Sequence, residues 1–255
     1  MKVTLLGTGT SGGVPQIGCQ CSTCLSSDPR DKRTRCSAMI ETDDACVLID
    51  CGPDFRQQML GRPFRHIDAI FITHEHYDHV GGIDDIRPGL LFGDVHIYAE
   101  DIVAEHLKQR IPYCFTPVER RYPGVPAITL EHMEPHVPVE VGSLQIMPIR
   151  VMHGTLPIVG FRIGPLTYIT DMKSFPESEW QYVEGTKVLV VNALHHRVHP
   201  SHQSVSDAIR FAQRVGADDT YFVHMSHFVL PHAEEDALLP PHIHLGYDGL
   251  ELNVE

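Results

Sequence analysis

Short apolar runs rich in β-branched residues recur along the chain and are separated by turn-forming residues. This pattern is typical of strands that are buried in sheets. In the first half of the chain the runs cover residues 2–7, 37–42, 45–50, 66–73 and 94–100. In the second half they cover residues 126–133, 143–152, 160–163, 166–171, 187–194 and 220–225. Residues 242–254 are similar to a hairpin, with Asp248 and Gly249 as its tight turn.

Two segments between these runs have the apolar spacing of amphipathic helices. They cover residues 101–111 and 204–217, and Gly216 is placed to cap the second. Residues 84–91 predict a short or kinked helix, because Pro88 interrupts them. Strands interspersed with helices over 255 residues predict an α/β or α+β fold in a single domain, residues 1–255.

The chain is acidic, with a formal net charge of −13 and only 20 Lys and Arg residues. Such a surface repels polyanions, so we expect a small-molecule substrate and no nucleic acid polymer as partner. The first apolar run reaches Gly7 too early for a signal peptide, and no run approaches the ~18 apolar residues that cross a membrane. We therefore expect a cytoplasmic protein without a membrane partner. Its seven cysteines, an odd number, do not indicate a disulfide framework.

A dense histidine motif, FITHEHYDHVGG, covers residues 71–82. Its β-branched start predicts a buried strand. His74 and His76 then share one face of extended chain, and Asp78 and His79 follow where the chain turns toward a helix. Imidazole and carboxylate ligands suit Zn, Fe, Mn or Ni, so the motif predicts a metal site without naming the metal. Four ligand-type side chains this close together argue against a merely solvated histidine-rich loop.

His-x-His-x-Asp-His after a hydrophobic strand resembles the signature of the metallo-β-lactamase-fold hydrolases. The resemblance extends over essentially the whole chain. It implies a four-layer αβ/βα sandwich with a dinuclear metal centre along one edge of the two sheets. It also implies an acidic residue that ends an earlier strand and supports the ligand loop without binding metal, and Asp50 occupies that position.

The same resemblance implies three further ligands at the ends of apolar runs, namely His153, Asp171 and His224. One ion would be bound by His74, His76 and His153, and the other by Asp78, His79 and His224, with Asp171 as the bridge. Asp78 is also expected to take part in catalysis. The two ions are expected to be Zn or Mn. Every position of the superfamily pattern is present, which argues against a non-catalytic relative.

Three cysteines near the N-terminus, Cys19, Cys21 and Cys24, fall within six positions. Together with His227 they resemble an element of the PhnP-like cyclic phosphodiesterases, Cys-x-Cys-x-x-Cys, which a histidine three residues after the last active-site ligand completes. Three thiolates and one imidazole make a closed tetrahedral Zn site, so we expect one structural Zn ion. An idle or oxidised surface thiol cluster is the alternative.

A histidine-rich stretch precedes the second predicted helix and contains His195, His196, His199 and His202. In the PhnP-like and tRNA 3′-processing branches, a histidine just before a late helix approaches the scissile phosphate, and His202 has that position. The resemblance implies His202 as a catalytic phosphate contact or general acid, with His195 and His196 as candidates for the pocket wall. An ordinary surface-loop histidine is the alternative.

The resemblance implies a dinuclear metal-dependent phosphodiesterase that hydrolyses a small cyclic ribose phosphodiester with a metal-bridging hydroxide. Three alternatives stay open, since one fold hosts several chemistries: a tRNA 3′-processing-type endonuclease, a thioester or lactone hydrolase, and a non-catalytic metal-binding accessory protein. The acidic charge and the lack of a Lys/Arg-rich insert disfavour the nuclease. A homodimer is compatible with the resemblance.

Overall fold

The computed structural model describes residues 1–87, 95–120, 123–126 and 128–255, and these residues form two seven-stranded sheets. The strands of the first sheet are β1 (Lys2–Gly7), β2 (Ser37–Glu41), β3 (Cys46–Ile49), β4 (Ala69–Phe71), β5 (Val95–Ala99), β6 (Ile128–His132) and β14 (Leu250–Asn253). Those of the second sheet are β7 (Val139–Val141), β8 (Leu144–His153), β9 (Leu156–Ile163), β10 (Leu166–Ile169), β11 (Val188–Asn192), β12 (Asp219–Val223) and β13 (Ile243–Leu245).

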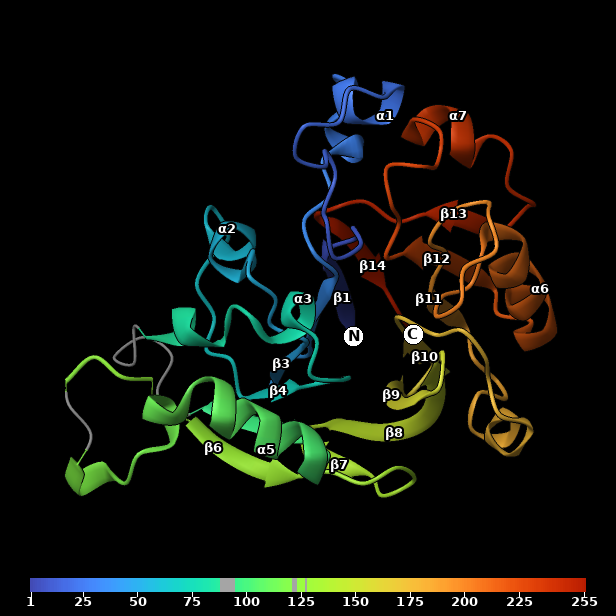
Figure 1. Ribbon diagram of the computed structural model, residues 1–255. Helices are drawn as coiled ribbons and strands as arrows, with labels where there is room; N and C mark the ends of the chain where they lie inside the picture. The colour runs from blue at the N-terminus through green and yellow to red at the C-terminus, as the bar shows by residue number, and fades with distance from the viewer. Residues whose placement is uncertain (88–94, 121–122, 127) are drawn as a thin grey trace.

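The strand order is β14-β1-β2-β3-β4-β5-β6 in the first sheet and β13-β12-β11-β10-β9-β8-β7 in the second (Figure 1). Each sheet combines antiparallel and parallel pairing. In the first, β14 to β3 pair antiparallel and β3 to β6 parallel. In the second, β7 to β10 pair antiparallel and β10 to β13 parallel. Parallel neighbours need crossover connections, and helices and irregular loops fill these stretches.

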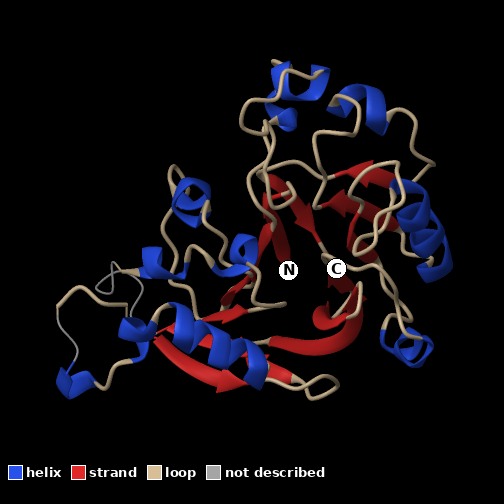
Figure 2. Cartoon of the chain, in the orientation of Figure 1, coloured by secondary structure: helices blue, strands red, loops and turns tan. Residues whose placement is uncertain are grey.

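The described helices are α1 (Ser22–Leu25), α2 (Phe55–Met59), α3 (Tyr77–Val80), α5 (Asp101–Arg110), α6 (Val205–Val215) and α7 (His232–Asp236). Short 3₁₀ turns cover Pro29–Asp31, Ile83–Ile86, Pro112–Phe115, Val118–Arg120 and Glu177–Tyr182. The helices lie outside the pair of sheets (Figure 2). Ser204 caps α6 in a reciprocal capping box with Asp207, and Gly216 ends the helix at φ 70°.

Three hydrophobic clusters fill the spaces between the layers. The central cluster lies between the sheets, where Ile49 and Phe71 of the first sheet join Phe161 of the second. A second cluster packs helices α2 and α5 on the outer face of the first sheet, and a third packs α6 on the outer face of the second sheet. The predicted α/β sandwich is therefore confirmed, with helices and sheets in four layers.

The predicted helices at residues 101–111 and 204–217 are confirmed as α5 and α6. The predicted hairpin at residues 242–254 is wrong, because β13 pairs with β12 while β14 pairs with β1 of the other sheet. The carboxylate of Asp248 explains the crossing. It accepts hydrogen bonds from the backbone and hydroxyl groups of Thr8 and Thr34, which fasten the connection to the first sheet.

Of the helix predicted at residues 84–91, the described part is a 3₁₀ turn, Ile83–Ile86, and Pro88 and the residues after it lie outside the described residues. Within the described chain, none of the helices has both the length and the apolar character needed to cross a bilayer.

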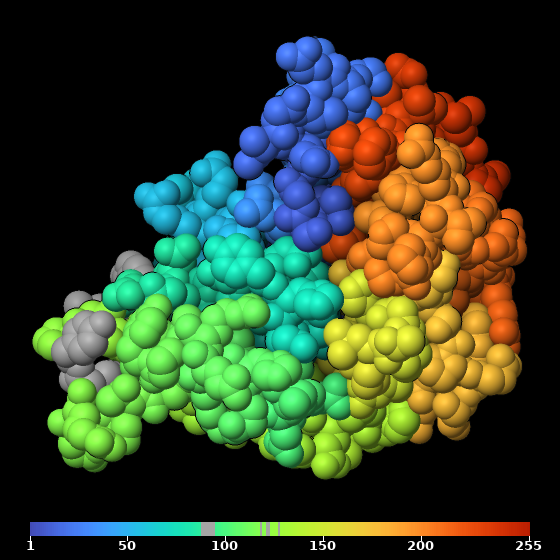
Figure 3. Space-filling view, in the orientation of Figure 1, coloured from blue at the N-terminus to red at the C-terminus, as the bar shows by residue number. Residues whose placement is uncertain are grey.

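In the space-filling view, the blue-to-green half of the chain and the yellow-to-red half pack side by side on one face (Figure 3). The candidate site draws its residues from both halves.

Candidate metal centre

The histidine motif lies where β4 passes into helix α3. The chain leaves β4 at Phe71 and bends at Thr73. It is extended again at His76, which precedes the first helical residue of α3. His74 and His76 direct their imidazoles to one side, with Nε2 of His74 2.9 Å from Nδ1 of His76. Asp78 and His79 lie on the first turn of the helix.

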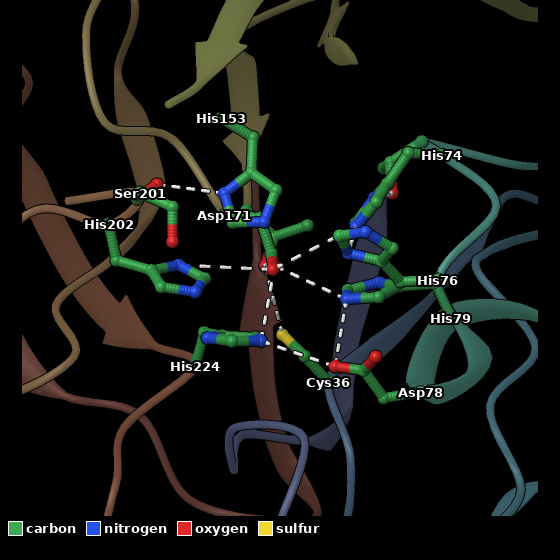
Figure 4. A network of polar contacts seen from close by, with 12 residues as sticks. Cys36, His74, His76, Asp78, His79, His153, Asp171, Ser201, His202 and His224 are labelled. Carbon is green, nitrogen blue, oxygen red and sulfur yellow. Dashed lines mark hydrogen bonds and ion pairs between the residues drawn. The ribbon is translucent and has the colours of Figure 1, made fainter. Parts of the chain in front are cut away.

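Three residues from the second half of the chain complete this side of the centre, as Figure 4 shows. His153 is the last residue of β8, Asp171 follows β10, and His224 follows β12. A carboxylate oxygen of Asp171 lies 3.2 Å from Nε2 of His79 and 3.2 Å from Nε2 of His224. Its other oxygen lies 3.9 Å from Nε2 of His74.

The ligand atoms of the seven residues fall into two compact groups. Within each group they lie within 4.8 Å of one another, and the groups are His74, His76 and His153, and Asp78, His79, Asp171 and His224. Asp171 stands between the groups, the place expected of a bridging carboxylate. The structure therefore brings together all seven residues that the resemblance implied as ligands.

The backbone is unusual at three of the strand ends that meet here. Asp50, Asp171 and His224 have positive φ values of 61°, 56° and 55°. Non-glycine residues rarely adopt this left-handed conformation, and such strain gathers at functional sites where the surrounding structure enforces it. Each of the three directly follows a buried strand or lies one residue beyond it, so the strained turn aims the side chain toward the centre.

Asp50 supports the histidine motif through hydrogen bonds, as the resemblance implied. Its carboxylate accepts hydrogen bonds from the backbone and hydroxyl groups of Thr73, and its Oδ2 lies 2.6 Å from Nδ1 of His79. A carboxylate only accepts, so His79 donates from Nδ1, and Nε2 is the atom that can bind a metal once it gives up its proton. Gly82 allows the close packing behind the motif, because a Cβ there would lie 2.0 Å from the carbonyl oxygen of Gly52.

The charges of the centre are strongly coupled. Burial alone would lower the pKa of His79, but the carboxylates of Asp171 and Asp50 raise it well above its usual value. Burial would raise the pKa of Asp171, but the neighbouring His224 and His79 lower it well below the usual range. Burial and the charge on His79 lower the pKa of His74, which therefore stays neutral, the form that binds a metal.

The centre fits a pair of metal ions in its donor chemistry. Nε2 of His79 and both ring nitrogens of His224 are buried and have no hydrogen-bond partner among the described residues. Buried nitrogen atoms without partners cost free energy, and here the two Nε2 atoms face Asp171, where a cation would satisfy them. The short His74–His76 contact likewise places two imidazole nitrogens where one ion would be shared. The donor set of imidazoles and carboxylates suits divalent transition-metal ions.

His202 belongs to the same constellation. Its Nδ1 lies 3.9 Å from Asp171, and its ring centroid lies 4.9 Å from that of His224 and 4.5 Å from that of His153. This Nδ1 is buried and has no hydrogen-bond partner in the described chain. Burial, together with the neighbouring His224, lowers the pKa of His202 to about 3, so the ring is neutral at ordinary pH.

The structure separates the other three histidines of this stretch. His196 points away and forms an ion pair with Glu235 at 2.8 Å. His195 is buried, and its ring contacts those of His199 and Phe228. His199 lies between them and the centre, with its ring centroid 5.0 Å from that of His202. His195 thus lies near the site while His196 does not.

The four residues of the expected structural Zn site also come together. Nδ1 of His227 lies 3.2 Å from Sγ of Cys19 and 3.5 Å from Sγ of Cys21, and with Cys24 all four ligand atoms lie within 4.8 Å of one another. Burial would raise the pKa of Cys21, but hydrogen bonds from Cys24 and His227 lower it to about 6. Three sulfurs and one imidazole nitrogen in this arrangement fit a closed tetrahedral Zn site.

Sequence reasoning missed two supporting residues. The backbone carbonyl of Ser201 accepts a hydrogen bond from Nδ1 of His153 at 2.7 Å, and Oγ1 of Thr73 lies 2.9 Å from Nδ1 of His74. The position of Thr73, directly before the first motif histidine, was a usable signal. No sequence signal marks Ser201, because a backbone carbonyl can belong to any residue.

Comparison with known proteins identifies the family. Residues 46–225 match the family model described as beta-lactamase superfamily domain, and the chain belongs to this superfamily. A solved structure described as a new diphosphatase from the PhnP family superposes with a TM-score of 0.91 and 39% identity, covering 98% of this chain and 96% of that one. Zn(2+)-bound PqqB from Methylobacterium extorquens shares the fold, with a TM-score of 0.85 and 19% identity over the full length of both chains.

Curated relatives carry two other names. A protein of Porphyromonas gingivalis (strain ATCC BAA-308 / W83), named octanoyltransferase, is 43% identical over 257 residues, which cover 100% of this chain and 52% of that protein. Coenzyme PQQ synthesis protein B of Xanthomonas oryzae pv. oryzae (strain MAFF 311018) is 29% identical over 87% of this chain and 72% of its own. The chain therefore spans about half the length of the octanoyltransferase. The family and the PhnP-family neighbour together support a metal-dependent hydrolase.

Proposed function

We propose that the protein is a dinuclear-metal phosphohydrolase that cleaves a P–O bond of a small phosphodiester. The observation that carries this proposal is the convergence of two ligand groups on Asp171, with His202 beside them as a further group that neither ligand set requires. The PhnP-family neighbour, described as a diphosphatase, supports chemistry at phosphorus.

The residues of the centre have different roles in the proposed reaction. Bound in the two ligand groups, divalent ions would lower the pKa of a water molecule and stabilise charge that develops on the phosphate oxygens. Asp50 and the carbonyl of Ser201 hold His79 and His153 in the tautomer that leaves Nε2 free as a ligand. Asp78, 3.3 Å from Nε2 of His79 and 3.5 Å from Nε2 of His224, supplies the remaining carboxylate.

His202 acts as a phosphate contact in this proposal. Its depressed pKa of about 3 means that it is neutral when an anion arrives, so it donates a hydrogen bond from one ring nitrogen. An anionic phosphate placed against the ring would raise this pKa, so that the ring could take up a proton from solvent and pass that proton to the departing oxygen. His202 would therefore act first as a phosphate contact and then as the general acid.

A cyclic ribose phosphodiester is our first candidate substrate, and a linear diphosphate is the second. The resemblance of the cysteine element and His202 to the PhnP-like branch supports the first, and the description of the neighbour as a diphosphatase supports the second. The net charge of −13 keeps a small molecule, not a nucleic acid polymer, as the proposed partner.

The test is a turnover screen of the metal-loaded protein. The substrates are bis(p-nitrophenyl) phosphate, a nucleoside 2′,3′-cyclic phosphate, a dinucleoside diphosphate, an acyl thioester and a β-lactam, with Mn²⁺ or Zn²⁺ added. We expect turnover of at least one phosphoester and its loss in Asp171→Ala. Silence on all three phosphoesters, with two metal ions bound per chain, would refute the proposal.

Thioester hydrolysis is a second candidate function because of one observation. The relative named octanoyltransferase is 43% identical to this chain from end to end, and acyl groups are commonly carried as thioesters. The name describes the whole relative, of which this chain matches 52%. Turnover of an octanoyl thioester at a rate above that of every phosphoester would favour this function over the first.

A further inference from the structure

An exposed aromatic ring and an exposed cation lie side by side on the two loops that carry His202 and His224. Phe228 follows His224 by four residues, and 57% of its surface is exposed. The guanidinium carbon of Arg197 lies 5.5 Å from the centroid of the Phe228 ring. Arg197 belongs to the loop between β11 and α6, which also carries His202.

A row of ring contacts joins this pair to the centre. The Phe228 ring centroid lies 6.0 Å from that of His195, which lies 5.9 Å from that of His199. His199 in turn contacts His202 at 5.0 Å, and His202 stacks on the ligand His224. Phe228 and Arg197 are therefore connected to the centre through packed rings of the same two loops. The His195 ring in this row is buried, and Phe228 also contacts the His227 ring at 4.1 Å.

Arg197 is one of several exposed arginines without an ion pair within the described residues, as are Arg56, Arg110 and Arg120, but it is the one on a loop of the site, and four other exposed arginines are paired. Arg30, Arg87, Arg210 and Arg214 each form an ion pair with an aspartate or glutamate. Arg197 makes no ion pair with any carboxylate in the described chain, although acidic residues outnumber basic ones by 33 to 20. Its charge is thus available to an anionic ligand.

The backbone holds the pair in place. The amide of Ser226 donates to the carbonyl of Leu194 at 3.0 Å, which ties the two loops together. The amide of Phe228 donates to Oγ of Ser226 at 3.3 Å, and the amide of Arg197 donates to Nδ1 of His195 at 3.2 Å. Preorganised loops lose less entropy on binding, as a specificity site requires.

We propose that Phe228 and Arg197 form a subsite for the half of the substrate that lies away from the scissile P–O bond, and that this half is a nucleotide. The planar base stacks on Phe228, and a second phosphate group binds the guanidinium of Arg197. Aromatic rings bind bases by stacking, and arginine binds phosphate with charge-assisted hydrogen bonds. The inference rests on the proposed phosphohydrolase function and deepens it by naming the substrate class.

The test compares three cyclic phosphodiesters that differ only in what the subsite would bind. Methyl β-D-ribofuranoside 2,3-cyclic phosphate has neither base nor second phosphate, adenosine 2′,3′-cyclic phosphate adds the base, and the 5′-phosphorylated form of the latter adds the second phosphate as well. In the wild type we expect kcat/KM to rise about tenfold with each addition, the size of one good contact. Phe228→Ala should abolish the preference for the base, and Arg197→Ala the preference for the 5′-phosphate.

Matched controls are Phe64→Ala and Arg214→Ala. Phe64 is 54% exposed, Arg214 is paired with Glu177, and neither lies in the two site loops, so both variants should keep the wild-type preferences. Equal loss of preference in Arg197→Ala and Arg214→Ala would overturn the inference, as would a wild type that turns over the methyl riboside cyclic phosphate and the nucleotides equally well.

A binding measurement separates this inference from the proposed function. Calorimetric titration with adenosine 5′-monophosphate should show affinity about tenfold weaker in Arg197→Ala than in wild type. No turnover of the three diesters, of bis(p-nitrophenyl) phosphate or of a dinucleoside diphosphate, with two metal ions bound, would refute the phosphohydrolase function. Equal affinity for the monophosphate in wild type and Arg197→Ala would refute the subsite.

Discussion

Replacing Asp50 by asparagine tests whether the buried support of the motif sets metal affinity. Asp50 is completely buried, and it accepts hydrogen bonds from Thr73 and from Nδ1 of His79. An asparagine keeps the shape but turns one oxygen into a donor. If its amide group faces His79, then two donors meet unless His79 moves its proton to Nε2, the atom that faces Asp78 and Asp171. If the amide is flipped, its donors face the N–H of Thr73 instead.

Either arrangement breaks one hydrogen bond to a charged group. Such a bond contributes about 1.5–3 kcal/mol, which corresponds to roughly 10–100-fold in a binding constant. We therefore expect Asp50→Asn to weaken the ion at Asp78, His79 and His224 by that factor. The ion at His74 should weaken less, because Thr73 lies between Asp50 and His74 and can rotate its hydroxyl.

The assay is competition with a chromophoric chelator, combined with metal analysis after dialysis. Asp248→Asn is the matched control, since Asp248 also accepts hydrogen bonds from backbone and hydroxyl groups of two threonines but lies at the β13–β14 connection. It should lower stability and leave metal affinity unchanged. Wild-type affinity for both ions in Asp50→Asn, or equal weakening in both variants, would refute the reasoning.

Three further predictions follow. A Cys19→Ser, Cys21→Ser, Cys24→Ser variant should lose one Zn per chain, the ion that resists chelation better than the other two; metal analysis showing unchanged Zn would sink this assignment. His202→Ala should lower kcat/KM about 100-fold on a phosphodiester, while His196→Gln, whose side chain pairs with Glu235, should stay within about twofold. Burial and the adjacent Arg33 lower the pKa of His232 to about 4, below its unfolded value near 6.5, so its contribution to stability is present at pH 7 and is lost as pH falls toward 4. Urea unfolding should therefore show wild type losing about 1–2 kcal/mol more than His232→Asn between pH 7 and pH 5, and parallel losses would contradict it.

Predictable features of the fold were those encoded locally. Helix α6 carries its capping box, its apolar stripe and its terminal Gly216 within one short segment, and each signal could be recognised without knowledge of the partners. The connection from β13 to β14 was not predictable in this way. Asp248-Gly249 favours a tight turn, but the pairing of its flanking strands depends on Thr8 and Thr34, more than 200 residues away.

The candidate site likewise contains residues that local sequence predicts and residues that it does not. The residues of the motif are contiguous, so their chemistry was evident from spacing, whereas His153, Asp171 and His224 could be assigned only through the family resemblance. Phe228 and Arg197 belong to no motif. Their proposed role in binding substrate depends on a contact between two loops, and the sequence pattern does not predict which loops contact each other.

The left-handed backbone at Asp50, Asp171 and His224 shows why the strand ends carry the ligands and their support. A strand buried on both faces fixes the backbone up to its last residue, and the next residue must turn sharply to leave the sheet. A left-handed turn costs about 1–3 kcal/mol for a non-glycine residue. Glycine would remove that cost but also the side chain, so a ligand at this position must accept the strain. Metal binding can offset it, because the same turn that strains the backbone aims the carboxylate or imidazole at the ion. We therefore expect the metal-free protein to be most readily distorted at these strand ends, before the sheets themselves loosen.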